Sequence, residues 1–247
     1  MKAYLLAAGL GTRLRPYTDT TPKCLMPICG RPLLEIWLDL LAAHGIDHVL
    51  INLHHHAGKV RNFLERYRRD HRLPRVEAVY EPVLLGSAGT LWANRDFVAG
   101  QDDFLVVYAD NLTRVNLTKM IDRHRGFRSM EGVLTMGVFR APDPSACGIV
   151  TCDRQDRIVA FVEKPRRPQG NLANGGIYVA ASRLWEHFPS HAENSGPFDF
   201  GHHVLPKLAG KMFAYKIDEF LMDIGTPENW ALARQEWKAL ENRSTNR

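Results

Sequence analysis

The sequence predicts an α/β protein whose mainly parallel, mixed sheet is flanked by helices. Apolar runs of strand length alternate with amphipathic helical segments, as in parallel sheets with helical crossovers. Polar residues directly follow several predicted strands, where open α/β sheets bind ligands. At 247 residues the chain suits one large domain. We expect this domain over 1–241, followed by a polar, disordered tail over 242–247.

The predicted elements follow from the spacing of apolar residues. A first strand at 2–8 leads into a glycine-rich turn. A first helix begins at Pro32, because proline suits the first helical position, and ends near Gly45, because glycine suits the C-terminal cap. Further strands are predicted at 48–53, 76–80, 104–108, 133–139, 148–152, 158–162, 177–180, 212–216 and 220–222. Further helices are predicted at about 57–69, 86–92, 117–127, 200–208 and 227–240.

The most specific pattern lies in the first 27 residues. The first strand runs into Gly9-Leu-Gly11-Thr-Arg13-Leu-Arg15-Pro, and Thr-Pro-Lys23 follows. Free backbone N–H groups in such a turn can surround phosphate oxygens, and arginine adds a forked cationic donor. The turn lacks the lysine–hydroxyl pair of a P-loop and the third glycine of a dinucleotide-binding loop. It therefore predicts a phosphate-binding loop of another kind.

This block resembles the sugar-1-phosphate nucleotidyltransferases, close to guanylyltransferases for mannose-1-phosphate or heptose-1-phosphate, and the resemblance extends from Lys2 to about Trp230. It implies a Rossmann-like fold of the nucleotidyltransferase type A kind. It also implies a reaction in which a sugar-1-phosphate oxygen attacks the α-phosphorus of a nucleoside triphosphate and pyrophosphate leaves. The cofactor implied is Mg²⁺.

The resemblance assigns a catalytic and metal-binding set. Arg13, Lys23 and Asp110 are expected to be catalytic, and Asp110 and Asp223 to bind the metal through their carboxylates. Two departures from the family pattern are Ala109, where a glycine is usual, and Cys24, where a proline is usual. The lysine role is unaffected by the second departure.

The substrate contacts implied by the resemblance fall into two sets. Those expected to bind the nucleotide are Leu6, Ala8, Gly9, Gly11, Thr12, Arg13, Glu81, Gly86 and Ser87. Those expected to bind the sugar phosphate are Asn111, Glu163, Lys164, Asn174 and Gly175. Glu163 and Lys164 begin a Glu-Lys-Pro sequence at a predicted strand end, and Gly86 opens a Gly-Ser-Ala-Gly segment.

The nucleobase is predicted from hydrogen-bond chemistry. A carboxylate such as that of Glu81 only accepts hydrogen bonds, and guanine presents two donors on one edge. GTP with mannose-1-phosphate or a manno-heptose phosphate is therefore the first choice. The alternative is a dTTP- or UTP-dependent enzyme acting on a glucose-type or N-acetylhexosamine-type phosphate. A non-catalytic nucleotide-sugar-binding regulator is an alternative of another class.

Composition narrows the partners. The net charge of +5 suits small polyanionic substrates. Basic residues are scattered, so we expect no nucleic acid, and no apolar stretch approaches the roughly 18–20 residues that span a bilayer, so we expect no membrane partner. We expect a cytoplasmic enzyme and consider a homodimer possible. The run His54–His56 is predicted to serve the loop or the helix cap rather than a metal, because successive side chains diverge.

Overall fold

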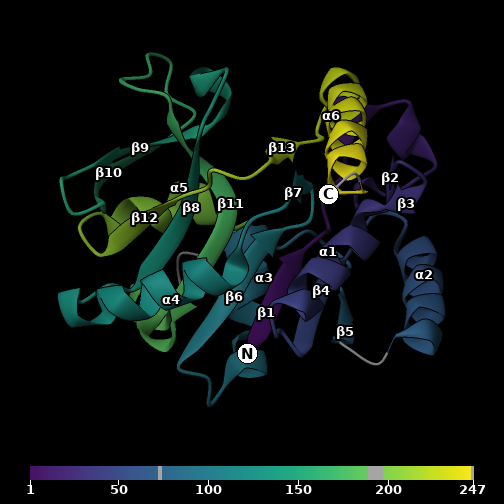
Figure 1. Ribbon diagram of the computed structural model, residues 1–247. Helices are drawn as coiled ribbons and strands as arrows, with labels where there is room; N and C mark the ends of the chain where they lie inside the picture. The colour runs from purple at the N-terminus through teal and green to yellow at the C-terminus, as the bar shows by residue number, and fades with distance from the viewer. Residues whose placement is uncertain (72–73, 189–196, 246–247) are drawn as a thin grey trace. The chain divides into compact units, whose positions relative to one another are not determined.

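The computed structural model describes residues 1–71, 74–188 and 197–245 (Figure 1). Contacts divide the chain into two compact units. Unit 1 comprises Met1–Tyr4, Val83–Val107 and Val115–Glu219. Unit 2 comprises Leu5–Pro82, Tyr108–Arg114 and the chain from Phe220 onward. The division falls within the first strand, β1 (Lys2–Leu6), and each unit is described separately.

Unit 2 is built around parallel strands β4 (His48–Leu53) and β5 (Arg75–Tyr80), paired from His48↔Arg75 to Leu53↔Tyr80. Its helices are α1 (Leu33–Ala43), α2 (Ala57–Asp70) and α6 (Pro227–Thr245). Its short paired strands are β2 (Pro27–Ile28) with β3 (Arg31–Pro32) and β7 (Asn111–Thr113) with β13 (Leu221–Asp223). Three single-turn 3-10 helices, Thr12–Leu14, Tyr17–Asp19 and Lys23–Leu25, follow β1.

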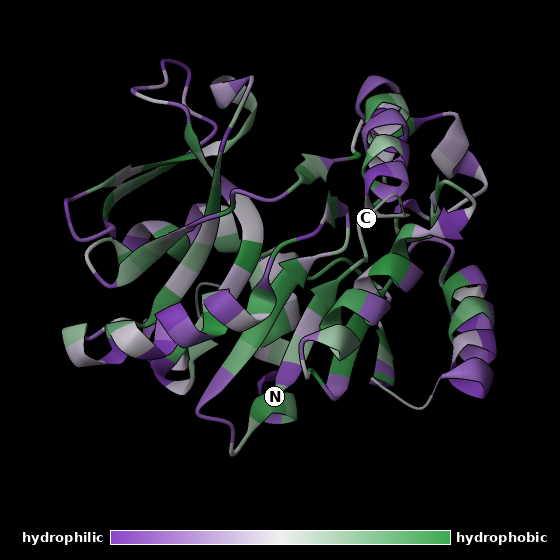
Figure 2. Ribbon diagram, viewed as in Figure 1, coloured by the Kyte–Doolittle hydropathy of each residue, from purple (hydrophilic) through white to green (hydrophobic). Residues whose placement is uncertain are grey.

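The helices of unit 2 form where the apolar spacing predicts them. The apolar face of α2 is Val60, Phe63, Leu64 and Tyr67, all buried, at the i, i+3, i+4, i+7 spacing of one helix face. Hydrophilic and hydrophobic residues accordingly alternate along α2 in Figure 2. The helix buries that face in the core of unit 2 and leaves its arginines exposed.

In the described part of unit 1, strands pair in the spatial order β6, β11, β8, β12, β10, β9. Their bounds are β6 Asp103–Tyr108, β11 Leu172–Ala181, β8 Leu134–Arg140, β12 Met212–Lys216, β10 Arg157–Glu163 and β9 Gly148–Cys152. Only β8 and β12 are parallel among these described neighbours. Helix α4 (Leu117–Phe127) contacts β8, β11 and β12, and the shorter helices are α3 (Ser87–Ala93) and α5 (Phe200–His203) (Figure 1).

The predicted α/β architecture, a mixed sheet flanked by helices, is confirmed. Parallel pairing is seen between β4 and β5, whereas β10 and β11 run antiparallel to their neighbours. The helix predicted at 200–208 ends earlier, at His203, and a 3-10 turn containing Pro206 follows. Proline lacks the N–H that would continue the α-helix, which accounts for the difference.

The prediction of a disordered tail over 242–247 is wrong for residues 242–245, because α6 extends to Thr245. Trp237 Nε1 donates to Glu241 Oε1 at 2.9 Å, one helical turn further on, and no glycine or proline interrupts the segment. Residues 246–247 lie outside the described residues. The single-domain bounds of 1–241 stay a prediction. Among the described residues, no helix has both the length and the apolar character needed to cross a membrane.

Candidate active site

Four charged side chains of unit 2 form one cluster. Lys23 Nζ lies 2.7 Å from Asp110 Oδ2 and 3.2 Å from Asp223 Oδ1. Arg13 Nη2 lies 3.6 Å from Asp223 Oδ2. The Lys23 side chain is 10% exposed and that of Arg13 is 65% exposed. Lys23 is therefore committed to the two carboxylates, whereas Arg13 keeps donors available to a ligand.

The backbone brings the two aspartates together from positions 113 residues apart in the sequence. Strand β13 pairs antiparallel with β7, with Asp223 opposite Asn111. The N–H of Ile224 donates to the carbonyl of Asp110 at 3.1 Å. Because directly paired residues on neighbouring strands have close Cβ atoms, this register places Asp223 beside the Asp110–Asn111 turn.

The charges determine the protonation of the cluster. Burial would lower the pKa of Lys23, but the carboxylates of Asp110 and Asp223 outweigh it and raise that pKa above its ordinary value. Burial likewise would raise the pKa of Asp110, but the charge and hydrogen bond of Lys23 hold it below its ordinary value. The lysine and this aspartate therefore both stay charged at neutral pH.

Two glycines are required by the packing around this cluster. Gly11 has a φ of +64°, and a Cβ there would lie 2.8 Å from Thr18 Cγ2. Thr18 Oγ1 in turn donates to the Gly11 carbonyl at 2.7 Å. A Cβ on Gly225 would lie 2.8 Å from Asp223 Oδ2 and 2.9 Å from Arg13 Nη2. Gly225 therefore leaves the space in which the arginine approaches the aspartate.

Gly9 differs from these two glycines. A Cβ built on it would meet no described atom within 4 Å, and its φ is not in the left-handed region. Gly9, Thr12 and Arg13 are exposed, whereas Leu6 and Ala8 are buried. The predicted loop thus presents an open backbone at Gly9 and an exposed side chain at Arg13.

Glu81 lies at the end of β5 and is buried, with 4% of its surface exposed. Its Oε1 accepts from Asn52 Nδ2 at 2.9 Å, and Asn52 Oδ1 accepts from the N–H of Ala7 at 2.8 Å. Glu81 is therefore tied through Asn52 to the end of the strand that precedes the loop. The base contact predicted for it stays a prediction. We did not predict a role for Asn52, although an asparagine in the apolar run 49–53 is a sequence signal.

The predicted nucleotide-binding residues Gly86 and Ser87 belong to unit 1. Gly86 has a φ of +79°, and a Cβ there would lie 2.5 Å from the carbonyl oxygen of Phe198. Ser87 Oγ donates to Asp199 Oδ2 at 2.9 Å and accepts from the N–H of Phe200 at 2.7 Å. The close approach of residues 198–200 explains the glycine and the serine structurally, and their nucleotide role stays a prediction.

Four of the five predicted sugar-phosphate residues also belong to unit 1. Glu163 ends β10, and Lys164 follows with a φ of +45°. Asn174 and Gly175 lie in β11, where the register with β8 shifts between Asn174 and Tyr178. Asn174 Nδ2 donates to the Tyr178 hydroxyl at 2.7 Å. The fifth, Asn111, lies instead in unit 2 beside Asp223.

Glu163 has a different environment from Asp110. Burial raises the pKa of Glu163, with a further increase from the charge of Asp199, against the opposing charges of Lys164 and His202. Its Oε1 lies 3.9 Å from Lys164 Nζ, beyond hydrogen-bond distance. Lys164 is 61% exposed, so its ammonium is available to an anion. We did not predict Asp199, which no local motif distinguishes.

The run His54–His56 does not form a ligand set. His54 Nδ1 contacts the carbonyl of Glu81, whereas Nε2 of His55 and of His56 contact the carbonyls of Thr18 and Asp19. The three rings therefore contact loop carbonyls, as the predicted loop role requires, and His56 occupies the N-cap position of α2 without a side-chain capping hydrogen bond. The described part of the chain holds no group of three or more His, Cys, Asp or Glu side chains arranged to bind a metal.

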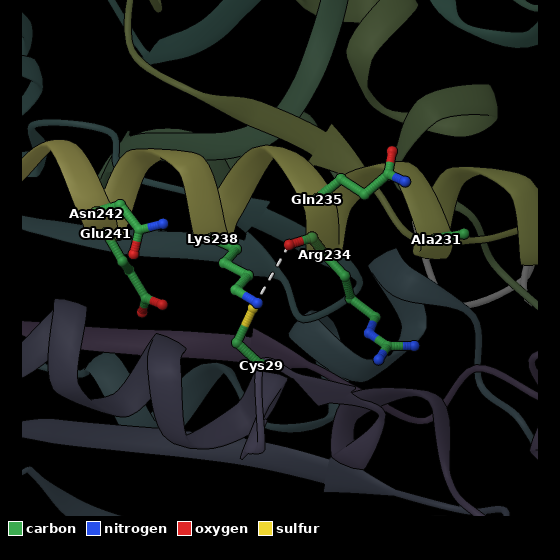
Figure 3. A pocket seen from close by; sticks show the side chains of 7 residues that line it. All are labelled: Cys29, Ala231, Arg234, Gln235, Lys238, Glu241 and Asn242. Atoms are coloured by element: carbon green, nitrogen blue, oxygen red, sulfur yellow. Dashed lines mark hydrogen bonds between the residues drawn. The ribbon is translucent and has the colours of Figure 1, made fainter.

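A separate cavity of about 670 Å³ lies along α6 (Figure 3). Arg234 and Lys238 extend into it from the helix, and Cys29 Sγ donates to the Arg234 carbonyl at 3.5 Å. None of the predicted site residues lines it. The cavity is therefore not part of the candidate active site.

The sequence of the chain matches one protein family. A family model described as nucleotidyl transferase matches residues 2–238, and the chain belongs to this family. The chain is 33% identical, over 95% of its length, to a UTP–glucose-1-phosphate uridylyltransferase of Synechocystis sp.. It is also 33% identical, over 92% of its length, to a mannose-1-phosphate guanylyltransferase of Mycobacterium tuberculosis.

The chain spans 63% of the first relative's length and 62% of the second's. A similar solved structure is that of a putative glucose-1-phosphate thymidylyltransferase of Bacillus anthracis, with a TM-score of 0.82 and 23% identity. That match covers 95% of this chain and 94% of the other and shows the fold.

Proposed function

We propose that the protein transfers a nucleotidyl group from a nucleoside triphosphate to a sugar-1-phosphate, giving a nucleoside-diphosphate sugar and pyrophosphate. The observation that carries the proposal is the cluster of Arg13, Lys23, Asp110 and Asp223, which alternates positive and negative charge beside an open glycine loop. Two polyanions must meet in this reaction, so positioning and charge stabilisation supply most of the catalysis.

In the proposed mechanism, unit 2 binds the phosphate groups of the triphosphate. The exposed guanidinium of Arg13 binds phosphate oxygens, and the open backbone at Gly9 allows a phosphate to approach closely. Lys23 keeps both aspartates oriented and holds Asp110 in its charged form. An oxygen of the sugar-1-phosphate forms a bond to the α-phosphorus, the bond from that phosphorus to the bridging oxygen breaks, and pyrophosphate leaves with the electron pair.

Unit 1 binds the sugar phosphate in this proposal. The exposed Lys164 ammonium pairs with the phosphate. The Glu163 carboxylate accepts hydrogen bonds from sugar hydroxyls, and Asn174 with Gly175 contacts the sugar where β11 is irregular. Asn111, next to the aspartates, contacts the same substrate from unit 2.

The residues fit Mg²⁺ as the cofactor. The carboxylates of Asp110 and Asp223 converge on one cation, the Lys23 ammonium, and Mg²⁺ prefers one or two carboxylates completed by water and phosphate oxygens. These two aspartates would hold the ion. When bound, it offsets negative charge on the substrate phosphates.

For the substrates, we propose GTP with mannose-1-phosphate or a manno-heptose-1-phosphate. The buried, acceptor-only carboxylate of Glu81 suits the donor edge of guanine. The alternative is UTP or dTTP with a glucose-type or N-acetylhexosamine-type phosphate, and the similarity to the Synechocystis enzyme supports UTP with the glucose-type phosphate. A cytoplasmic location and a possible homodimer belong to the same proposal and are checked by cell fractionation and light scattering.

The test is a pyrophosphate-release assay with Mg²⁺, each of GTP, dTTP, UTP, CTP and ATP, and a panel of sugar-1-phosphates. Mass spectrometry identifies the nucleotide sugar. We expect release only when both substrates are present, with the highest kcat/KM for GTP. Preference for a pyrimidine nucleotide overturns the guanine assignment alone. Nucleotide-sugar binding by folded protein without turnover supports a non-catalytic regulator instead.

A further inference from the structure

The carboxylate of Glu163 lies against two glycines. A Cβ on Gly201 would lie 2.9 Å from Glu163 Oε2 and 3.2 Å from its Cδ, and a Cβ on Gly148 would lie 2.6 Å from the same Oε2. Neither glycine has a φ in the left-handed region, so the backbone conformation does not require glycine at either position. The Glu163 carboxylate instead occupies the space that a Cβ at either position would take.

Gly201 is held in place by contacts within unit 1. The carbonyl of Phe198 accepts from the N–H groups of Ala88 and Gly89 at 2.9 and 3.0 Å. The N–H of Phe198 donates to the carbonyl of Leu85 at 2.7 Å. The side chain of Ser87 adds its bonds to Asp199 and to the N–H of Phe200. Residues 198–201 are thus fixed to the segment 85–89, and the glycine presents a rigid surface to the carboxylate.

The position of the Glu163 carboxylate therefore depends on the space left by the neighbouring glycines. Its side chain is 15% exposed, and Lys164 Nζ is too distant, at 3.9 Å, to orient the carboxylate by a hydrogen bond. An added methyl at 201 would occupy part of the space that the carboxylate fills and push it away. A displacement of about 1 Å at a group that binds substrate is enough to lose much of its effect.

We propose that Gly201 is a positioning residue for the sugar substrate. Because glycine has no side chain, it leaves the Glu163 carboxylate the space in which that group accepts hydrogen bonds from the sugar. This inference rests on the proposed function. Gly148 contacts the same oxygen, but a Cβ there would also lie 2.6 Å from Phe161 Cζ. A Cβ on Gly201 would also lie 3.2 Å from Asp199 Oδ1, which is farther than Phe161 Cζ is from a Cβ on Gly148. Gly201 is therefore the position at which the effect on Glu163 is better isolated.

The test compares Gly201→Ala with Gly126→Ala, in the wild-type background and in Glu163→Asp. Gly126 lies in α4 of unit 1, and a Cβ there would meet no described atom within 4 Å. Glu163→Asp shortens the side chain by one methylene and makes room for the new methyl group. We expect Gly201→Ala to raise the KM for the sugar-1-phosphate at least about 10-fold and to change the KM for the triphosphate less than about 2-fold.

In the Glu163→Asp background, Gly201→Ala should raise the KM for the sugar-1-phosphate by less than about 3-fold. The effects of two substitutions that act through the same group are not additive. Equal effects in the two backgrounds, or an effect no larger than that of Gly126→Ala, would overturn the inference. Calorimetry, which measures binding of each sugar-1-phosphate without turnover, separates the positioning role of Gly201 from the proposed function. If the wild type binds without turnover and Gly201→Ala weakens that binding, the function fails and the positioning role stands. If the wild type binds none of the panel, both are overturned.

Discussion

Two carboxylates of the candidate site show opposite electrostatic environments. Asp110 in unit 2 has its pKa lowered, because the Lys23 charge outweighs burial. Glu163 in unit 1 has its pKa raised, because burial outweighs the charge of Lys164. Lys23 lies 2.7 Å from its carboxylate partner, whereas Lys164 lies 3.9 Å away and is exposed. The distance and burial of the neighbouring lysine therefore decide which effect wins.

The difference suits the two proposed tasks. A group that binds a metal and faces phosphates must remain ionised without substrate, and a bound lysine ensures it. A group that accepts hydrogen bonds from neutral hydroxyls needs a defined position more than a paired charge. Unit 2 fixes its carboxylates by ion pairs, and unit 1 fixes its carboxylate by the space between glycines.

The largest expected effect is the loss of the aspartates of unit 2. Asp110→Asn and Asp223→Asn keep the shape and remove the charge, so we expect kcat to fall at least about 100-fold, since metal charge stabilisation contributes several kcal/mol. Steady-state pyrophosphate release at saturating Mg²⁺ measures it. Asp19→Asn is the matched control, because Asp19 pairs with Arg15 instead. Near-normal kcat in both variants would exclude the metal assignment.

Lys23→Met should have the next largest effect. It removes the cation that both aspartates contact and should lower kcat/KM for the triphosphate by about 10- to 100-fold, the range for a hydrogen bond to a charged group. Arg15→Ala serves as the control cation. The assignment of Lys23 fails if the two variants lose activity equally.

A smaller effect is expected from pH. Because the pKa of Glu163 is raised, its carboxylate protonates at a higher pH than the ordinary value of about 4.3. The ionised form accepts the sugar hydroxyls, so the KM for the sugar-1-phosphate should rise several-fold as pH falls through the raised pKa. In Glu163→Gln this dependence should disappear. A KM–pH profile that keeps the same inflection in the variant would show that another group titrates.

The smallest expected effect is on stability, and it has opposite signs in the two units. A raised carboxyl pKa means that ionisation disfavours the folded state as pH rises, so Glu163→Gln should match or exceed the wild-type Tm at pH 7. A lowered pKa means that ionisation favours the folded state, so Asp110→Asn should lower Tm slightly. The corresponding loss in the free energy of unfolding is less than about 1 kcal/mol for a partly exposed pair. Shifts of the same sign in metal-free buffer would contradict the comparison.

The sequence predicted the elements better than their contacts. Apolar periodicity predicts the bounds of α2 and β4 well, because the spacing of apolar residues is a local property of each segment. The glycine loop with Arg13 and Lys23 was also predictable, since its motif is local and unusual. The pairing of Asp223 with Asn111 depends on a register between strands far apart in the chain. The contact of Gly201 with Glu163 has no local signal, because it depends on three-dimensional packing alone.

In the proposed division of roles, Arg13 of unit 2 binds the triphosphate and Lys164 of unit 1 binds the sugar phosphate. The most direct test compares Arg13→Ala with Lys164→Ala. Both side chains are exposed, and Arg13 belongs to unit 2 whereas Lys164 belongs to unit 1. KM for each substrate and kcat are measured for both variants. We predict that Arg13→Ala impairs triphosphate KM and kcat, whereas Lys164→Ala raises the sugar-1-phosphate KM by about 10-fold or more and leaves triphosphate KM unchanged. A Lys164→Ala variant with normal sugar-1-phosphate KM and impaired triphosphate binding would contradict the account.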